Sequence, residues 1–204
     1  RSNKRANLYN RQIRTQIMGL ENALAVGDLL MVVKNNYFWL PTESTAGFIA
    51  NGDVLEVLRI KAFKDLYGFR FAEVHVRLVD YEDQAPFDTV LILDALDSET
   101  HALTAEQSNT LYTQVRQDYA HLPQYKQYTE VKKNPFFNAL QVKFAYAVTC
   151  HKAQGGQWKR VFVEQPYLPD GPSIAYYRWL YTAITRASEQ LFLIGFGDDY
   201  FSKD

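Results

Sequence analysis

The segment from Phe144 to Val163 constrains the fold more than any other part of the chain. Where it begins, apolar residues alternate with polar or small ones, which is the period of a pleated strand (Val142, Phe144, Tyr146 and Val148). Val161–Val163, at its end, is typical of a short buried strand. Between the two strands lies a polar, cationic stretch, Thr149–Gln157, which contains the pair Gly155-Gly156. The pattern predicts two strands joined by a glycine-containing turn.

The composition of this turn indicates an anion-binding loop. In open α/β sheets, ligand groups lie beyond the carboxyl ends of parallel strands. Paired glycines let the backbone approach a phosphate closely, because no Cβ obstructs the amide donors. His151 and Lys152 add side-chain donors suited to phosphate. Taken alone, the segment is equally compatible with a solvated strand-to-helix turn that binds nothing.

A second polar motif, Tyr181 to Ala187, follows at the end of a predicted helix. The helix is expected to begin with Ser173 as its N-cap, and a strand is expected at 190–196. At about 100° per residue the helix has one apolar face (Ile174, Tyr177, Leu180, Tyr181 and Ile184). The opposite face is polar and carries Arg186 near the helix end (Arg178, Thr182, Thr185, Arg186 and Glu189). We therefore expect truncation of Arg186 to leave the core intact.

Together, the two motifs resemble motifs V and VI of superfamily 1 helicases, particularly those of the RecD type. Tyr146 to Gly155 follows the family pattern Tyr-Ala-x-Thr-x-His-Lys-x-Gln-Gly. Tyr181 to Ala187 follows the pattern Tyr-Thr-Ala-x-Thr-Arg-Ala. Arg1-Ser2-Asn3 is similar to motif IV of the same family, which leads from a strand into a helix. Because no strand precedes Arg1, we expect the chain to be a fragment of a longer protein.

The resemblance implies an α/β fold, that of the second RecA-like domain of a helicase motor. A parallel sheet is expected from residues 1–25 and 140–204, truncated at its N-terminal side. Residues 26–139 are expected to form an inserted module that is similar to the Src-homology-3-like barrel of RecD-type helicases, with a helical extension.

Features within residues 26–139 independently predict a small β module. Asp28–Val33 and Val54–Ile60 have strand character, with the turn Asn51-Gly52-Asp53 between them. Several short strands separated by turns are typical of a small antiparallel barrel. Thr104 and Gln107 form a capping-box pattern, which predicts the start of a helix.

The resemblance also assigns roles at an ATP site. Arg186 would be the arginine finger that stabilises charge on the γ-phosphate, and Arg1 is a second catalytic candidate. Gly155 would place a backbone amide near the γ-phosphate. Gln157 stands where relatives often carry a glutamate near the ribose, and an amide there differs from that pattern.

Three residues of the glycine turn are assigned to nucleic acid in the same way. The resemblance implies that Thr149 and His151 face single-stranded DNA and donate to its phosphates. Lys152 would assist either the DNA or the nucleotide. Basic residues without acidic neighbours in 1–20 and 143–160 add a local anion-binding character to a chain of net charge −1.

Parts of a complete motor are missing from the sequence. It contains no Gly-x-x-x-x-Gly-Lys-Ser/Thr loop and no identifiable Walker B carboxylate. ATP and Mg²⁺ are therefore expected to bind only in the full-length protein, together with its N-terminal motor domain, and the fragment alone is expected to be inactive. Its other implied partners are single-stranded DNA and the subunits of a nuclease complex, as in exodeoxyribonuclease V.

Composition narrows the remaining possibilities. The four histidines lack metal-ligand spacing, so no metal site is expected. The single cysteine, Cys150, is typical of a reducing compartment, here the cytoplasm. No apolar run approaches the ~20 residues of a membrane span. Two functions are compatible with these observations: a part of an ATP-dependent helicase for DNA repair or recombination, or a non-catalytic nucleic-acid-binding or protein-docking module.

Overall fold

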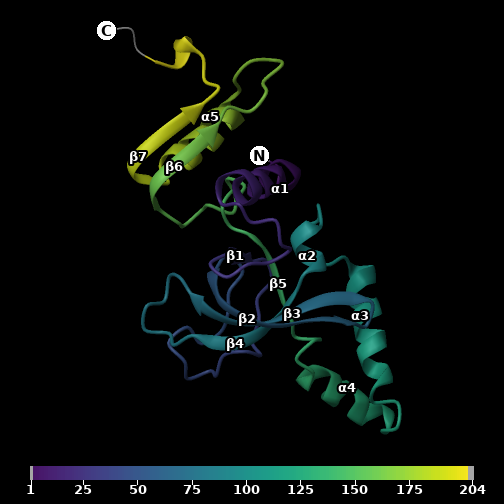
Figure 1. Ribbon diagram of the computed structural model, residues 1–204. Coiled ribbons are helices and arrows are strands. Elements are labelled where there is room, and N and C mark those ends of the chain that lie inside the picture. The colour runs from purple at the N-terminus through teal and green to yellow at the C-terminus, as the bar shows by residue number, and fades with distance from the viewer. Residues whose placement is uncertain (1, 202–204) are drawn as a thin grey trace. The chain divides into compact units, whose positions relative to one another are not determined.

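The computed structural model describes residues 2–201, which divide into two compact units (Figure 1). The larger unit spans residues 3–147, and the smaller one comprises Ser2 and residues 148–201. Among the described residues, none of the helices has both the length and the apolar character needed to cross a membrane.

Five strands close a barrel in the larger unit (β1 Leu29–Val32, β2 Val54–Leu66, β3 Phe69–Leu78, β4 Phe87–Ile92 and β5 Leu140–Phe144). β1 to β4 pair with their neighbours in antiparallel fashion. β5 closes the barrel, because it pairs antiparallel with β1 and parallel with β4. Leu30 lies opposite Phe144 on one side of β5, and Leu91 lies opposite Leu140 on the other.

Branched aliphatic side chains fill the barrel. They come from all five strands and are fully or almost fully buried (Leu30, Val32, Leu55, Val57, Val74, Val76, Leu91, Leu140 and Val142). Successive side chains on a strand point to opposite faces, so the alternating pattern read from the sequence places these residues inside and polar ones outside. Removal of this apolar surface from water is the main source of the barrel's stability.

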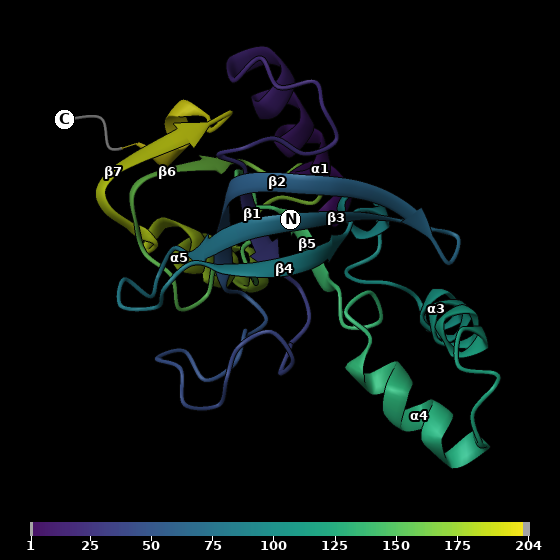
Figure 2. The same ribbon diagram turned by 60° about the horizontal axis from the view of Figure 1, so that its bottom comes forward.

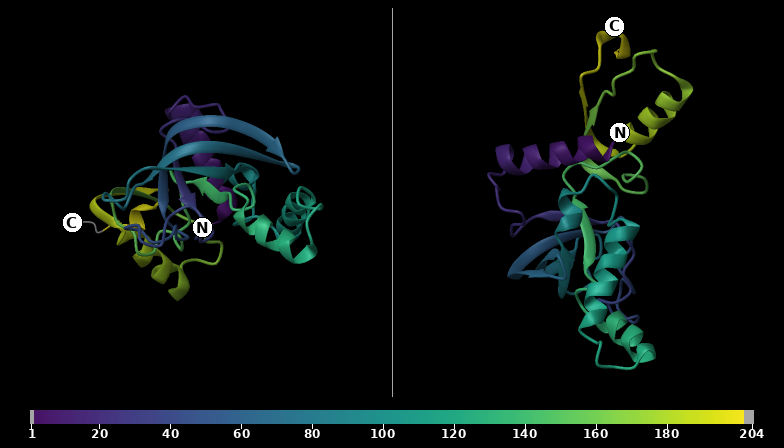
Figure 3. Two further views of the ribbon diagram at one scale, coloured as in Figure 1. Left: turned by 90° about the horizontal axis from the view of Figure 1, so that it is seen from below. Right: turned by 90° about the vertical axis from the view of Figure 1, so that its right-hand side faces the viewer.

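Helices pack outside the barrel in the same unit. α2 (Asp94–Asp97) follows β4, and the pair α3 (Ala105–Gln117) and α4 (Gln124–Lys133) lies beside the barrel (Figures 2 and 3). A second core joins α3 and α4 to β3 and β4 (Phe69, Phe71, Val90, Ile92, Leu111, Val115 and Val131). The turn of the long β2–β3 hairpin is tied to the end of α3, where the Tyr67 hydroxyl donates to Asp118 at 2.5 Å.

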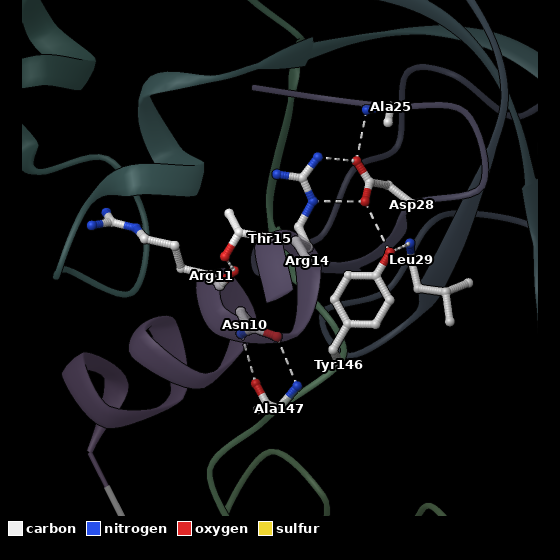
Figure 4. A network of polar contacts seen from close by, with 9 residues as sticks. All are labelled: Asn10, Arg11, Arg14, Thr15, Ala25, Asp28, Leu29, Tyr146 and Ala147. Carbon is white, nitrogen blue, oxygen red and sulfur yellow. Dashed lines mark hydrogen bonds and ion pairs between the residues drawn. The ribbon is translucent and has the colours of Figure 1, made fainter. Parts of the chain in front are cut away.

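The unit begins with α1 (Asn3–Gln12), which runs into a π-helical turn, η1 (Ile13–Ile17). From this turn Arg14 makes two hydrogen bonds of 2.9 Å to the fully buried carboxylate of Asp28 (Figure 4). Tyr146 donates to the same carboxylate at 2.9 Å. Asn10 exchanges two hydrogen bonds with the backbone of Ala147. These contacts fix α1 and η1 to the barrel and to the chain leaving β5.

The smaller unit has one two-stranded parallel sheet and one long helix. β6 (Trp158–Glu164) pairs with β7 (Ala187–Ile194), and α5 (Ile174–Ile184) connects them. A short 3₁₀ turn, η2 (Asp198–Tyr200), follows. Phe162 and Phe192 stack across the two strands, with ring centroids 4.5 Å apart. Gln165 links α5 to the C-terminal turn, because it accepts from the Tyr176 hydroxyl and donates to that of Tyr200.

The predicted RecA-like parallel sheet is wrong. Within residues 2–201, parallel pairing is limited to β6 with β7 and to a short stretch of β4 with β5. The strand around Val142 was expected in that sheet, and it instead closes the barrel. The alternating pattern correctly predicts a strand there, but it carries no information about which strands lie on either side. That residues 26–139 are an insertion in a motor domain stays a prediction.

Candidate functional site

The glycine-containing turn forms at the start of the smaller unit. The carbonyl oxygen of Thr149 accepts hydrogen bonds from the amides of Lys152 and Ala153, at 2.9 and 3.1 Å. The Gly156 amide then donates to the carbonyl of Ala153 at 3.2 Å. Gly155 has φ +87°, which is in the left-handed region where side chains are strained. The backbone conformation at position 155 therefore favours glycine.

Gly156 lies close to an aromatic side chain. A Cβ on this residue would lie 2.4 Å from Cη2 of the Trp158 ring, which is less than any real contact distance. The indole therefore lies directly against the backbone of Gly156 and covers one side of the turn. Sequence reasoning missed Trp158, because no local pattern links a strand residue to the turn before it.

α5 positions the second motif. The helix begins at the predicted N-cap, where the Ser173 hydroxyl accepts from the amide of Tyr176 at 3.2 Å. The predicted apolar face is not the buried face of the helix, because neither of the two buried residues belongs to it. Tyr176 and Ala183 are the buried residues of the helix, whereas Ile174, Tyr177 and Tyr181 are exposed. With Arg178 and Thr182 these exposed side chains line a shallow hollow.

Arg186 joins the two motifs. It follows the helix end, and three of its N–H groups donate within the unit: Nε to the Thr182 carbonyl, Nη2 to the Thr185 hydroxyl and Nη1 to the Gly156 carbonyl, each at 3.1 Å. A guanidinium has five N–H donors. Two of them thus have no hydrogen bond to the residues that the structure describes, and the half-buried side chain can donate these to an anion.

The other predicted residues lie along the same turn, with different exposure. Thr149 is only 8% exposed, whereas His151 and Gln157 are exposed. Lys152 is half-buried, and its burial lowers the pKa of the ammonium group below the usual value. Arg1, the second catalytic candidate, lies outside the described residues.

Cys150 anchors the turn to α5. Its thiol donates to the carbonyl oxygen of Trp179 at 3.6 Å. Burial raises the pKa of the Cys150 thiol, and the positive charge of Arg186 offsets part of this increase. The thiol is therefore a packed, protonated group, which fits a structural role at this site.

The chemistry available here is anion binding by the cation of Arg186 and the backbone of the glycine turn. In the part of the chain that the structure describes, no three Asp, Glu, His or Cys side chains lie together to hold a metal ion. Any divalent cation that accompanies a bound phosphate would need ligands from elsewhere.

Comparison with known families gives a match to this part of the chain. Residues 144–194 match the model of the UvrD-like helicase C-terminal domain, which covers 51 of the 204 residues. Comparison with curated proteins gives no match to the chain. The segment that is similar to a UvrD-like helicase contains both the glycine turn and Arg186, and it supports the resemblance to a helicase C-terminal region that the motifs indicated. The match suggests a helicase fragment with nucleic acid as a partner.

Proposed function

We propose that the chain is a part of an ATP-dependent DNA helicase of RecD-like type, in which Arg186 is the arginine finger. The observation that supports this proposal is the hydrogen bond of 3.1 Å between Arg186 Nη1 and the Gly156 carbonyl, within the segment that is similar to UvrD-like helicases. It places the only cation of the second motif beside the turn where Gly155 exposes its backbone. Both groups can then contact the same anion.

The free N–H groups of Arg186 fit the terminal phosphate of ATP. Negative charge develops on the transferred phosphoryl group, and a guanidinium held beside it lowers the barrier. Because three hydrogen bonds already fix the side chain, little reorganisation is needed when the nucleotide binds. Gly155 would supply an amide donor at the γ-phosphate, and Gln157 an amide side chain near the ribose.

ATP, when bound, supplies the phosphoryl group that is transferred to water. The described residues offer a finger and a backbone donor but no phosphate-binding loop, so they fit half of such a site. The triphosphate and its Mg²⁺ would be held by another motor domain of the same protein, across a cleft to which this chain contributes Arg186.

The exposed side of the glycine turn is the proposed single-stranded DNA contact. His151 is exposed and Lys152 is half-buried, so both can donate to phosphates. Thr149 is largely buried, and its carbonyl holds the turn through Lys152 and Ala153. Its hydroxyl would contact the backbone of the strand only at the edge of the site.

The experiment is single-turnover ATP hydrolysis by the full-length protein with single-stranded DNA. Arg186→Ala should lower the rate about 10³-fold or more while nucleotide binding persists. Arg186→Lys keeps the charge but not the planar fork, and it should recover only a part of the rate. Arg178→Ala, on the exposed face of the same helix, is the matched control and should be neutral.

Two outcomes oppose the proposal. An Arg186→Ala protein that hydrolyses ATP at the normal rate would leave this residue with a structural role alone. A full-length protein that binds single strands but hydrolyses no ATP would instead support a non-catalytic nucleic-acid-binding module.

A further inference from the structure

α4 presents two tyrosines and several lysines to solvent. The fold itself uses little of this helix: Val131 is fully buried in the second core, and Gln127 donates to the Leu122 carbonyl. Tyr125 and Tyr128 are 72% and 51% exposed. Two large aromatic rings on the outer side of a helix contribute little to the packing of this unit, so another role is expected for them.

The exposed tyrosines share one face with basic residues. At about 100° per residue, Tyr125, Tyr128 and Lys132 lie on the same side of α4, and Lys126 lies on the adjoining side, next to Tyr125. The Lys132 ammonium lies 4.3 Å from the centre of the Tyr128 ring, and that of Lys126 lies 6.0 Å from the Tyr125 ring. We call these four residues the tyrosine–lysine face.

The charge on this face is positive. Glu130 is the one acidic residue of α4, and it pairs with Lys133 at 3.0 Å. Lys126 and Lys132 keep their charge uncompensated by any acid of the helix. The face therefore combines cations with flat aromatic surfaces.

A simpler explanation is that the lysines only stabilise the helix. Lys132 and Tyr128 are four residues apart, a spacing at which side chains on a helix touch and support it. This accounts for one pair. It does not account for Tyr125, because Lys126 is adjacent to it in sequence and its ammonium lies farther from the ring. Tyr125 is also more exposed than Tyr128.

We propose that the tyrosine–lysine face binds single-stranded nucleic acid. Proteins that hold single strands without sequence preference stack bases on aromatic side chains and attract the backbone with lysine and arginine. Residues three apart on a helix lie about 5–6 Å apart, so Tyr125 and Tyr128 can stack on neighbouring bases. Lys126 and Lys132 then lie beside the phosphates. This contact lies in residues 3–147 and is independent of Arg186 and the glycine turn.

Single-stranded nucleic acid is a better fit than an acidic protein. Both would be attracted by the lysines, but only unpaired bases offer flat rings to stack on two exposed tyrosines. In a duplex, base faces are covered by neighbouring bases. We therefore expect the face to bind a single strand more tightly than a duplex.

The test is fluorescence anisotropy of the full chain with an oligothymidine of about 16 nucleotides, the upper end of site sizes for single strands. Tyr125→Ala and Tyr128→Ala should each weaken binding at least about five-fold, and the corresponding changes to Phe should not. Lys126→Gln and Lys132→Gln should each reduce the slope of log affinity against log salt by about 0.7.

Controls come from the same unit. Tyr37 is 71% exposed, nearly the same fraction as Tyr125, and Lys34 is also exposed. Neither residue belongs to α4, so Tyr37→Ala and Lys34→Gln should leave binding unchanged. Circular dichroism should show that each variant is folded. Photocrosslinking to an oligonucleotide that carries 5-iododeoxyuridine should label the peptide containing Tyr125 and Tyr128.

Three results would overturn the proposal. The first is unchanged affinity in a folded Tyr125→Ala, Tyr128→Ala double variant. The second is equal affinity for duplex and single strand. The third is competition by a polyglutamate peptide of matched charge, to the same extent in the unchanged protein and in the tyrosine variants. That result would assign the face to an acidic protein. Changes at His151 and Lys152 test the glycine turn separately, so failure at one place can be told from failure at the other.

Discussion

Arg186 Nη1 donates a hydrogen bond of 3.1 Å to the carbonyl oxygen of Gly156 and so ties the end of α5 to the glycine turn. The polar face of the predicted helix suggested a side chain without structural consequence. The structure instead gives Arg186 three hydrogen bonds inside its unit. Loss of the guanidinium therefore removes both a charge from the site and the hydrogen bond that holds the turn to the end of α5.

Arg186→Ala should destabilise residues 148–201 locally. Three lost hydrogen bonds from a half-exposed cation are expected to cost about 1–2 kcal/mol, because water replaces part of each. Hydrogen exchange of the amides near Gly156, measured by mass spectrometry, should be faster in the variant. Arg178→Ala should match the unchanged protein. Identical exchange in all three proteins would show that the turn does not depend on Arg186.

Gly155→Ala should be costly, although no atom would contact the new Cβ. The φ angle of +87° is the cause, because a side chain in this region is expected to cost about 1–3 kcal/mol. Gly155→Asn should cost less, since asparagine tolerates left-handed conformations better than most residues. Urea denaturation of the three proteins tests the order. Equal midpoints would mean that the turn changes its conformation to accept a side chain.

Interactions between residues close in sequence could be predicted. The Thr104 hydroxyl accepts from the Gln107 amide at 3.1 Å, and the Gln107 side chain accepts from the Thr104 amide at 2.9 Å, as the capping pattern indicated. The pairing of Leu140 with Leu91 could not be predicted, because it depends on which distant strands meet. The same residues are compatible with a sheet or a barrel, and closure of the sheet into a barrel is a tertiary property.

In the candidate site, too, local features could be predicted from the sequence and contacts between distant residues could not. The sequence places Gly155 in a turn and Arg186 near the end of a helix, and the structure has both there. The contact between Arg186 and Gly156 joins residues 30 positions apart and has no local signal. The packing of the Trp158 ring on Gly156 likewise depends on how β6 leaves the turn.

Asp28→Asn should destabilise the larger unit strongly. The carboxylate is fully buried and accepts from Arg14, Tyr146 and the Ala25 amide. An amide would leave the guanidinium of Arg14 buried without a counter-charge, at a cost of about 3–5 kcal/mol. Hydrogen exchange of β1 and β5 measures this loss. Tyr146→Phe removes a neutral hydroxyl that donates to Asp28 and accepts from the Leu29 amide, and it should cost about 1–2 kcal/mol. Comparable losses in both variants would show that the ion pair is not the main contribution.

Cys150 should react slowly with alkylating reagents in the folded chain. Burial raises the pKa of its thiol, so the reactive thiolate is scarcer than in an unfolded chain at the same pH. The pKa of the Cys150 thiol is therefore higher in the folded chain than in the unfolded chain. The thiol therefore contributes stability that is fully present below the unfolded pKa and is lost as the pH rises through the folded pKa.

The measurement is the rate of iodoacetamide labelling as a function of pH, across the range in which the thiol titrates, with and without denaturant. Cys150 is the single cysteine, so all labelling reports this site, and Cys150→Ser provides the blank. We expect the pH midpoint of the labelling rate to be higher for the folded chain than for the denatured chain. Arg186→Ala should raise it further, because the guanidinium lowers the pKa of the thiol in the unchanged protein. A midpoint that falls in the variant would mean that loss of Arg186 exposes the thiol to water, and that the hydrogen bond to Gly156 closes this part of the turn.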